Sequence, residues 1–240
     1  MHRIKAILFD IDDTLYDLSI PFKEAFREFF PGEEIDLEGA FLASRKYSDR
    51  IYDRSLSGEI SMEEMYIYRL GNAFRDYGKI IDGATALQFQ SVYEKHQHNI
   101  RMTGEMEGLL EKLSKKTTLG IITNGPSEHQ RDKVRALGLE RWIPMERIWI
   151  SGDLGIGKPH KEIFAAAQDK LGLKPEEICF VGDAYGHDIL GARGAGWKAV
   201  WFNHRGRQAT GEAEPDYEVR SEQNLIALLE NPSKIRLQEF

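Results

Sequence analysis

Short apolar strings alternate with helix-length segments along much of the chain. The strings are mostly apolar and end in polar residues, which is typical of strands buried on both faces of a parallel sheet. We predict five such strands, over residues 4–10, 118–123, 147–151, 178–183 and 198–202, and helices over 104–115, 127–138, 160–171 and 187–195 between the later ones. The alternation predicts an α/β fold built on a doubly wound parallel sheet.

The stretch between the first two predicted strands follows a different pattern. It contains no comparable apolar string, and its spacing of Phe, Tyr, Arg and Glu predicts helices over residues 19–30, 36–55, 61–77 and 83–98. Ser61 with Glu64 fits a capping box that opens the third of these helices, and Asp82 fits an N-cap of the fourth.

These two patterns predict two domains. Residues 1–16 and 100–240 form the α/β core, and residues 17–99 form a helical domain inserted after the first strand. An insert at this point lies at the carboxyl edge of the sheet, where ligands bind in open α/β folds, and it is therefore placed to cover a site. A polar stretch over 206–215 predicts a loop before a last short strand and helix.

Composition and charge exclude several classes of protein. The 240 residues carry 39 acidic and 32 basic side chains, a formal charge of -7, which argues against binding to nucleic acid or to an anionic membrane. No apolar run approaches the roughly 18 residues of a membrane span, and the run over 6–9 is too short for a signal-peptide core. The single cysteine, Cys179, excludes an internal disulfide framework and a Cys-based zinc site. We expect a cytoplasmic protein with neither nucleic acid nor membrane as partner.

The first strand runs into a pair of carboxylates. Asp10 and Asp12 begin on the same side of an extended chain, where two negative charges repel unless a cation or a proton lies between them. This pattern favours a site that holds a divalent cation and performs nucleophilic or acid–base chemistry. Turn-forming aspartates at the end of a strand remain the alternative interpretation.

Three further segments carry candidate functional residues at strand ends or in the loops that follow strands. Thr123 and Asn124 precede a glycine and a helix, which suits an anion pocket but is also a common turn. Lys158 stands on a loop between glycine and proline, and in isolation it reads as a solvated surface charge. Asp183 ends the fourth strand, and Asp188 either joins it or only favours a helix dipole. If strand order brings these ends to the first strand, they form a magnesium and phosphate site.

Taken together in this order, the four segments resemble the haloacid dehalogenase superfamily, in its phosphatase branch with a helical cap inserted after the first strand. The resemblance implies a Rossmann-like core and covers nearly the whole chain. It implies that Asp10 is the nucleophile that carries an aspartyl phosphate and that Asp12 is the general acid and base.

The same resemblance implies the remaining roles of the site. Thr123 and Lys158 bind phosphoryl oxygens, with backbone amides near Ile11, Asp12, Asn124 and Gly125. Mg²⁺ is held by the carboxylates of Asp10 and Asp183 and by the backbone carbonyl of Asp12, and Asp188 anchors either the metal shell or Lys158. Mn²⁺ suits the same all-oxygen ligands.

The motif residues also limit the reaction. Dehalogenases of the superfamily lack the second aspartate, so Asp12 argues against dehalogenation. We predict a Mg²⁺-dependent phosphatase of a small phosphorylated metabolite, a nucleoside monophosphate or a sugar phosphate, that acts as a monomer or homodimer. The alternatives are a phosphomutase of the same superfamily and a catalytically silent binding partner.

Three side chains of the predicted cap are candidates for substrate specificity. Tyr47, Arg50 and Arg54 share one helical face by their spacing. An arginine there suits an anionic group and a tyrosine suits stacking, whereas a solvated helix face is the alternative.

Overall fold

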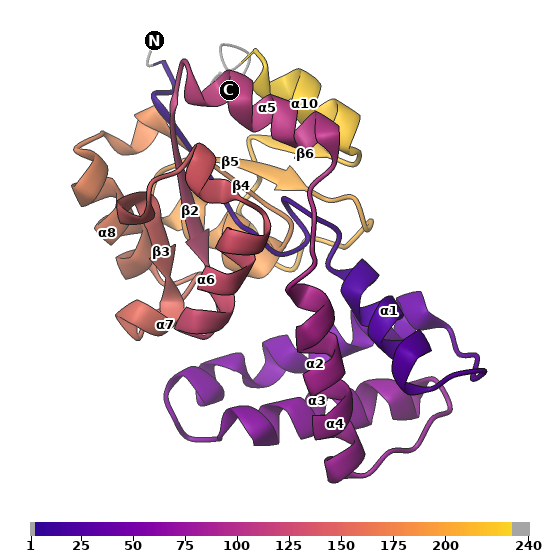
Figure 1. The fold of residues 1–240 in the computed structure, drawn as a ribbon. Coiled ribbons are helices and arrows are strands. Elements are labelled where there is room, and N and C mark those ends of the chain that lie inside the picture. The colour runs from indigo at the N-terminus through magenta and orange to yellow at the C-terminus, as the bar shows by residue number, and fades with distance from the viewer. Residues whose placement is uncertain (1–2, 232–240) are drawn as a thin grey trace. The chain divides into compact units, whose positions relative to one another are not determined.

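The computed structural model describes residues 3–231, and the chain divides into two compact units at the junctions 17/18 and 100/101 (Figure 1). The first unit combines the N-terminal segment with everything after residue 100, and the second is the continuous segment between the junctions. None of the helices in the described part of the chain is both long enough and apolar enough to cross a bilayer.

A six-stranded parallel sheet organises the first unit. The strands are β1 (Ala6–Phe9), β2 (Thr118–Thr123), β3 (Ile148–Ile150), β4 (Ile178–Gly182), β5 (Lys198–Phe202) and β6 (Tyr217–Val219), in the order β3-β2-β1-β4-β5-β6. The order reverses next to β1, whose neighbours are β2 and β4, and such a switch point is where open α/β sheets bind their ligands. The predicted α/β fold with a doubly wound parallel sheet is confirmed.

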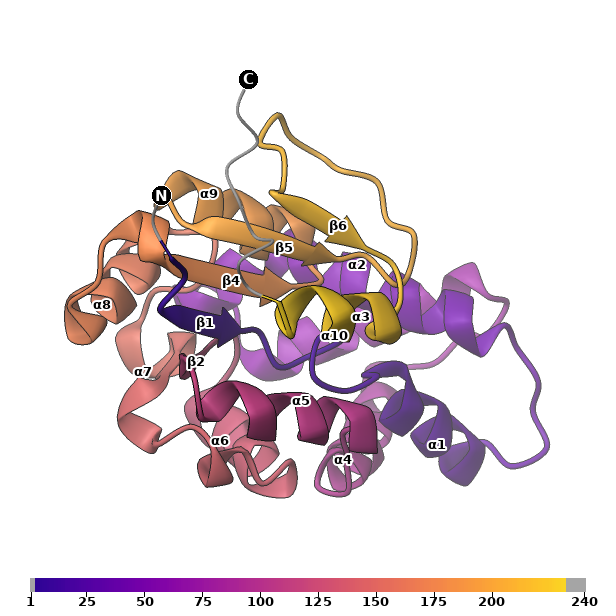
Figure 2. The ribbon, with the colours of Figure 1, turned by 90° about the horizontal axis from the view of Figure 1, so that it is seen from above.

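Helices cover both faces of this sheet, with α8 (Lys161–Leu171) and α9 (Leu190–Gly194) on one face and α5 (Gly104–Ser114) and α10 (Glu222–Leu229) on the other (Figure 2). Alternate residues of each strand point to opposite faces. Ala6 and Leu8 of β1 accordingly join Phe164 and Trp197 in one buried apolar cluster. The sheet is therefore buried on both faces, which explains why its strands read as continuous apolar strings.

Two further helices and several single turns complete the described part of the first unit. Helix α6 (Ser127–Ala136) follows β2, and α7 (Ser151–Leu154) follows β3. Turns of 3-10 type lie at Leu139–Arg141, Met145–Arg147 and Pro175–Glu177, and a π-helical turn at Tyr185–Ile189 leads into α9.

The second unit contains four helices, α1 (Ser19–Phe29), α2 (Leu37–Leu56), α3 (Met62–Asp76) and α4 (Gly83–Gln97). Capping side chains mark the first residues of three of these helices. Asp36 accepts a hydrogen bond from the third residue of α2, Ser61 and Glu64 form the capping box of α3, and Asp82 caps α4. Buried phenylalanines pack edge to face in its core, as Phe74 and Phe89 do with centroids 5.0 Å apart.

Candidate active site

The carboxyl ends of three neighbouring strands bring candidate side chains together. Asp10 directly follows β1, and its backbone N–H donates to the carbonyl of Val181 on β4 at 2.9 Å. Thr123 is the last residue of β2, and Asp183 directly follows β4. The side chains of Asp10, Thr123 and Asp183 belong to residues that are more than nine-tenths buried, so the sheet topology assembles a polar site inside the protein.

Lys158 lies between two carboxylates. Its Nζ donates to Oδ1 of Asp10 at 2.7 Å and to Oδ1 of Asp188 at 2.6 Å, and the residue is only 2% exposed. The other carboxylate oxygen of Asp188 accepts from the backbone N–H of Ala184 at 2.9 Å. The interpretation of Lys158 as a solvated surface charge is therefore wrong, and Asp188 is a direct partner of this lysine.

Asn124 fixes the loop that carries Lys158. Its Nδ2 donates to the carbonyl oxygen of Lys158 at 2.8 Å, and its Oδ1 accepts from the backbone N–H of Lys158 at 2.8 Å. Because both ends of the amide are engaged, the Asn124 side chain builds the loop. A phosphate-binding role for Asn124 would therefore fall to its backbone.

Burial controls the electrostatics of this group. It raises the pKa of Asp10 from 3.8 to about 7, although Lys158 acts to lower it, while Asp188 and Asp12 raise it further. Burial also raises the pKa of Asp183 well above its ordinary range, against the effect of Arg207. For Lys158 burial acts to lower the pKa, but the two carboxylates outweigh burial and the pKa lies above its ordinary value. The cations present do not fully offset the buried negative charge.

Three of the carboxylates could hold a metal ion. Asp10, Asp183 and Asp188 each place a carboxylate oxygen within 4.8 Å of the others. Mg²⁺ prefers oxygen ligands, and the raised pKa values of two of these acids are the signature of buried negative charge that a cation would offset. The residues present therefore fit Mg²⁺. We expected four carboxylates to meet here, but that of Asp12 lies outside the group, so its predicted metal contact would be through the backbone carbonyl.

A buried hydroxyl offers a place for an anion. Thr123 Oγ1 is buried and has no hydrogen-bond partner among the described residues, and the same holds for Thr14 Oγ1 in the loop after β1. Gly125 has a φ of 152°, a backbone conformation that favours glycine. Its N–H donates to Ser151 Oγ at 2.9 Å, so the expectation that this amide is available to phosphate is wrong.

Asp12 is bound by a set of donors that the sequence analysis missed. Lys133 Nζ donates to both carboxylate oxygens at 2.7 Å, and Tyr16 Oη donates to Oδ1 at 2.6 Å. Gln130 Nε2 contributes a longer contact to Oδ2 at 3.3 Å and also donates to the carbonyl of Asn124 at 2.9 Å. Lys133 and Gln130 are both buried, on α6.

A second cationic group surrounds Asp13, which has a φ of 60°. Arg205 donates to both carboxylate oxygens of Asp13 at 2.6 Å, and His204 Nε2 lies 3.0 Å from its carbonyl oxygen. Arg207 donates to Oδ2 of Asp183 at 2.7 Å. The loop after β5 therefore ties the loop after β1 to a predicted metal ligand.

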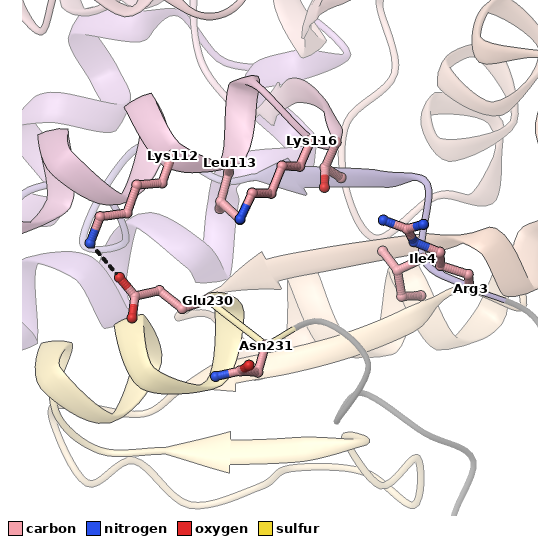
Figure 3. A pocket seen from close by; sticks show the side chains of 8 residues that line it. Arg3, Ile4, Lys112, Leu113, Lys116, Glu230 and Asn231 are labelled. Atoms are coloured by element: carbon pink, nitrogen blue, oxygen red, sulfur yellow. Dashed lines mark hydrogen bonds and ion pairs between the residues drawn. The ribbon is translucent and has the colours of Figure 1, made fainter.

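A pocket of about 520 Å³ lies elsewhere in the first unit, next to the residues that precede β1 and β2 (Figure 3). Its described lining includes Arg3, Lys112 and Lys116, and the acid Glu230 is ion-paired with Lys112 at 2.6 Å. This pocket lies at the amino ends of the strands and lacks, among its described lining residues, a group of carboxylates able to hold a metal. The candidate active site is therefore the group of carboxylates at the carboxyl edge of the sheet.

Comparison with known proteins agrees with the geometry. A family model described as haloacid dehalogenase-like hydrolase matches residues 4–196. The chain belongs to that family. The HAD-hydrolase YfnB of Bacillus subtilis is 29% identical over 231 residues, which is 95% of this chain and 97% of YfnB. A crystal structure of YfnB bound to magnesium superposes with a TM-score of 0.73 and covers 95% of this chain and 99% of that one, at 26% identity.

Two relatives of this haloacid dehalogenase-like hydrolase are named as phosphatases. The glyceraldehyde 3-phosphate phosphatase of Pyrococcus furiosus is 29% identical, covering 96% of this chain and 95% of its own. The N-acylneuraminate-9-phosphatase of Mus musculus is 26% identical, covering 96% of each. The predicted membership of the superfamily, in its phosphatase branch, is confirmed.

The candidate specificity residues of this hydrolase lie on α2 with partners inside the helical unit. Tyr47 Oη donates to Asp76 at 2.9 Å, and the Arg50 guanidinium lies 4.9 Å from the centre of the Tyr47 ring. Arg54 is ion-paired with Glu59 at 2.8 Å. These contacts are those of a hydrated helix face, and a role in substrate selection stays a prediction.

One sequence signal pointed to the missed donors. Gln130 and Lys133 are spaced i, i+3 on a helix that begins four residues after β2 ends, so they share one face of that helix. Val134 is the one apolar residue that this helix buries, and therefore polar side chains had to supply the rest of the buried face.

Proposed function

We propose that this haloacid dehalogenase-like hydrolase is a Mg²⁺-dependent phosphatase that hydrolyses a small phosphorylated metabolite through an aspartyl phosphate on Asp10. The observation that carries the proposal is the buried group in which Lys158 binds both Asp10 and Asp188 while Asp183 completes a set of carboxylate oxygens. Hydrolysis of phosphate monoesters has one of the largest uncatalysed barriers known, so a dense group of charges is what the reaction requires.

The chain's own residues account for the first half of the reaction. A carboxylate oxygen of Asp10 attacks phosphorus, and the bond to the ester oxygen breaks as that oxygen takes a proton from Asp12. Lys158 and the hydroxyl of Thr123 hold phosphoryl oxygens and offset their charge. Asp10, Asp183 and the backbone carbonyl of Asp12 would hold Mg²⁺, which supplies positive charge at the phosphoryl oxygens and at the nucleophile.

The second half releases phosphate. Water attacks the phosphorus of the aspartyl phosphate while Asp12, now a carboxylate, accepts a proton from it. The bond to Asp10 breaks, and both aspartates return to their starting forms. Asp188 keeps Lys158 in place throughout, since it binds the same ammonium group.

Substrate choice belongs to the same proposal. The relatives named above act on a phosphorylated aldehyde and a phosphorylated sugar acid, and another, from Thermus thermophilus, is named phosphoserine phosphatase. We include nucleoside monophosphates and sugar phosphates as the classes expected for this enzyme. Residues 17–99 would act as a cap that selects among them, with Tyr47, Arg50 and Arg54 as candidate contacts. The lone, buried Cys179 suits a reducing compartment, and the proposal includes a cytoplasmic location and a monomer or homodimer.

The test is release of inorganic phosphate from a panel of nucleoside monophosphates, sugar phosphates, glyceraldehyde 3-phosphate, phosphoserine and a phosphorylated sugar acid. Each compound is assayed with Mg²⁺, with a chelator, and with Asp10→Asn. An exposed aspartate on α8 gives the matched control, Asp169→Asn. We expect release that requires Mg²⁺, that is abolished by Asp10→Asn and that Asp169→Asn preserves. Release that continues undiminished in Asp10→Asn would contradict the mechanism.

A further inference from the structure

Asp12 lies on a loop, and donors nevertheless bind both oxygens of its carboxylate. Lys133 reaches both of its oxygens from a single ammonium group, and Tyr16 adds a short hydrogen bond to one of them. A carboxylate bound through both oxygens cannot rotate about its last side-chain bond without breaking a contact. The arrangement therefore fixes the direction in which Asp12 presents its oxygens.

Burial of Lys133 is costly and needs an explanation. The residue is 3% exposed, and an ammonium group taken out of water is destabilising unless a well-placed partner offsets the lost hydration. Asp12 is that partner. A leucine or methionine at this position would fill the same space without the charge, so packing alone does not account for a lysine here.

The Asp12 cradle, defined as Lys133, Gln130 and Tyr16, is also packed against the candidate phosphate loop. Gln130 contacts Asp12 and the carbonyl of Asn124 with the same nitrogen. Gly125 leaves it the necessary room, because a Cβ at that residue would lie 2.4 Å from Gln130 Nε2. The position of the acid and the position of the phosphate loop are thus set by one group of contacts on α6.

From this geometry we propose that Lys133 is a positioning residue that aims Asp12 at the leaving oxygen of the substrate. The inference rests on the proposed phosphatase function. In the first half-reaction Asp12 gives its proton to the ester oxygen as the P–O bond breaks, and in the second it takes a proton from the attacking water. While Asp12 carries that proton on one carboxyl oxygen, Lys133 donates to the other, and once Asp12 is ionised Lys133 donates to both. Lys133 remains an ammonium group in both half-reactions and exchanges no proton.

If Lys133 positions Asp12, the effect of replacing Lys133 must depend on the leaving group of the substrate, whereas a lysine with only a structural role would affect all substrates alike. Departure of an alkoxide requires a proton, whereas departure of p-nitrophenolate does not, since that anion is stable in water. Misaiming Asp12 must therefore slow the first half-reaction of an alkyl phosphate and spare that of p-nitrophenyl phosphate. The value of kcat/KM reports the steps up to release of the leaving group, so the comparison is made with kcat/KM.

The experiment measures kcat/KM of Lys133→Met on both substrates, using the best alkyl phosphate of the panel. The matched control is Lys198→Met, because Lys198 is likewise buried and ion-paired, to Asp216 at 2.7 Å, at the amino end of β5. General acid catalysis contributes 10²–10⁴-fold, so we expect Lys133→Met to lose roughly 10²-fold on the alkyl phosphate and less than about 3-fold on p-nitrophenyl phosphate. Lys198→Met should change both values equally or not at all.

Two further variants keep the proposal testable if Lys133→Met folds poorly, as judged by circular dichroism. Tyr16→Phe removes one donor to Asp12 and keeps the ring, and it should show a smaller loss confined to the alkyl phosphate. Lys133→Arg retains a cation that can donate to both carboxylate oxygens and should recover most of the alkyl activity. Equal losses on both substrates, or none, overturn the positioning role while leaving the phosphatase intact. A wild-type enzyme inactive on every phosphate overturns the proposed function and this inference with it.

Discussion

Replacing Asp10 by Asn should make the metal-free protein more stable at pH 8, although it removes the proposed nucleophile. Burial raises the pKa of Asp10 from 3.8 to about 7 in the folded protein. Between these two pH values the folded carboxyl holds a proton that the unfolded carboxyl has lost. The stability of the wild-type protein must therefore fall as pH rises through this window, and Asn at this position removes that dependence.

The magnitude follows from the size of the shift. Each pKa unit corresponds to about 1.4 kcal/mol, so ionised Asp10 lowers the free energy of unfolding by about 4 kcal/mol above pH 7. Well below pH 3.8 the carboxyl is protonated in both states and contributes no difference. Urea denaturation with chelator present, at pH 5 and pH 8, gives the free energies of unfolding for wild type, Asp10→Asn and the exposed control Asp169→Asn.

We expect the stability gap between Asp10→Asn and wild type to widen by a few kcal/mol from pH 5 to pH 8, with no such change for Asp169→Asn. Adding Mg²⁺ at pH 8 should stabilise wild type more than Asp10→Asn, because the cation offsets the buried charge. A gap that stays constant with pH, or a less stable Asp10→Asn at pH 8, would refute the claim that Lys158 compensates the buried charge of Asp10 only in part.

Three further substitutions test separate parts of the structure. Lys158→Met leaves two buried carboxylates without their cation and should cost about 3–5 kcal/mol in urea denaturation at pH 7. Thr123→Val removes a buried hydroxyl without a partner among the described residues, so stability should hold or rise by about 1 kcal/mol while phosphate release falls about 10²-fold. Phe74→Ala opens the aromatic core of the helical unit and should cost about 3–5 kcal/mol, whereas exposed Ile80→Ala should cost almost nothing.

The elements of the sheet could be predicted closely because their environment leaves a simple pattern. Strands buried on both faces are continuous apolar strings, so the string over 178–183 matches β4 (Ile178–Gly182) to within one residue. The start of the helix predicted over 187–195 was less accurate, since the chain makes a π-helical turn at Tyr185–Ile189 first. That turn places Asp188 against Lys158, a contact between distant segments that local propensity does not encode.

Some residues of the candidate site could be predicted from the sequence, and others could not. Asp10, Thr123 and Asp183 stand at strand ends in a recognisable order, and strand order brings these three to one edge. Lys158 lies on a loop beyond β3, and Asn124 fixes the position of that loop. The contact between Lys133 and Asp12 could not be predicted because the two residues are 121 positions apart in the chain. The spacing of Gln130 and Lys133 indicates one shared helix face, but only the three-dimensional position of α6 shows that this face is turned toward Asp12.

The balance of charge explains why this edge of the sheet suits a metal ion and a phosphate together. Three carboxylates, of Asp10, Asp183 and Asp188, lie together, and that of Asp12 lies outside this group. Three cations offset these four charges in part, since Lys158 binds Asp10 and Asp188, Arg207 binds Asp183, and Lys133 binds Asp12. A phosphate dianion approaching this excess of negative charge would be repelled. A divalent cation among the carboxylates removes the excess, and only then can Lys158 attract the phosphate instead of serving mainly to neutralise Asp10. Binding of the metal and binding of the phosphate should therefore be cooperative. Calorimetric titration of Asp10→Asn with phosphate, with and without Mg²⁺, should show weaker cooperativity than the wild type, because one of the four charges is gone.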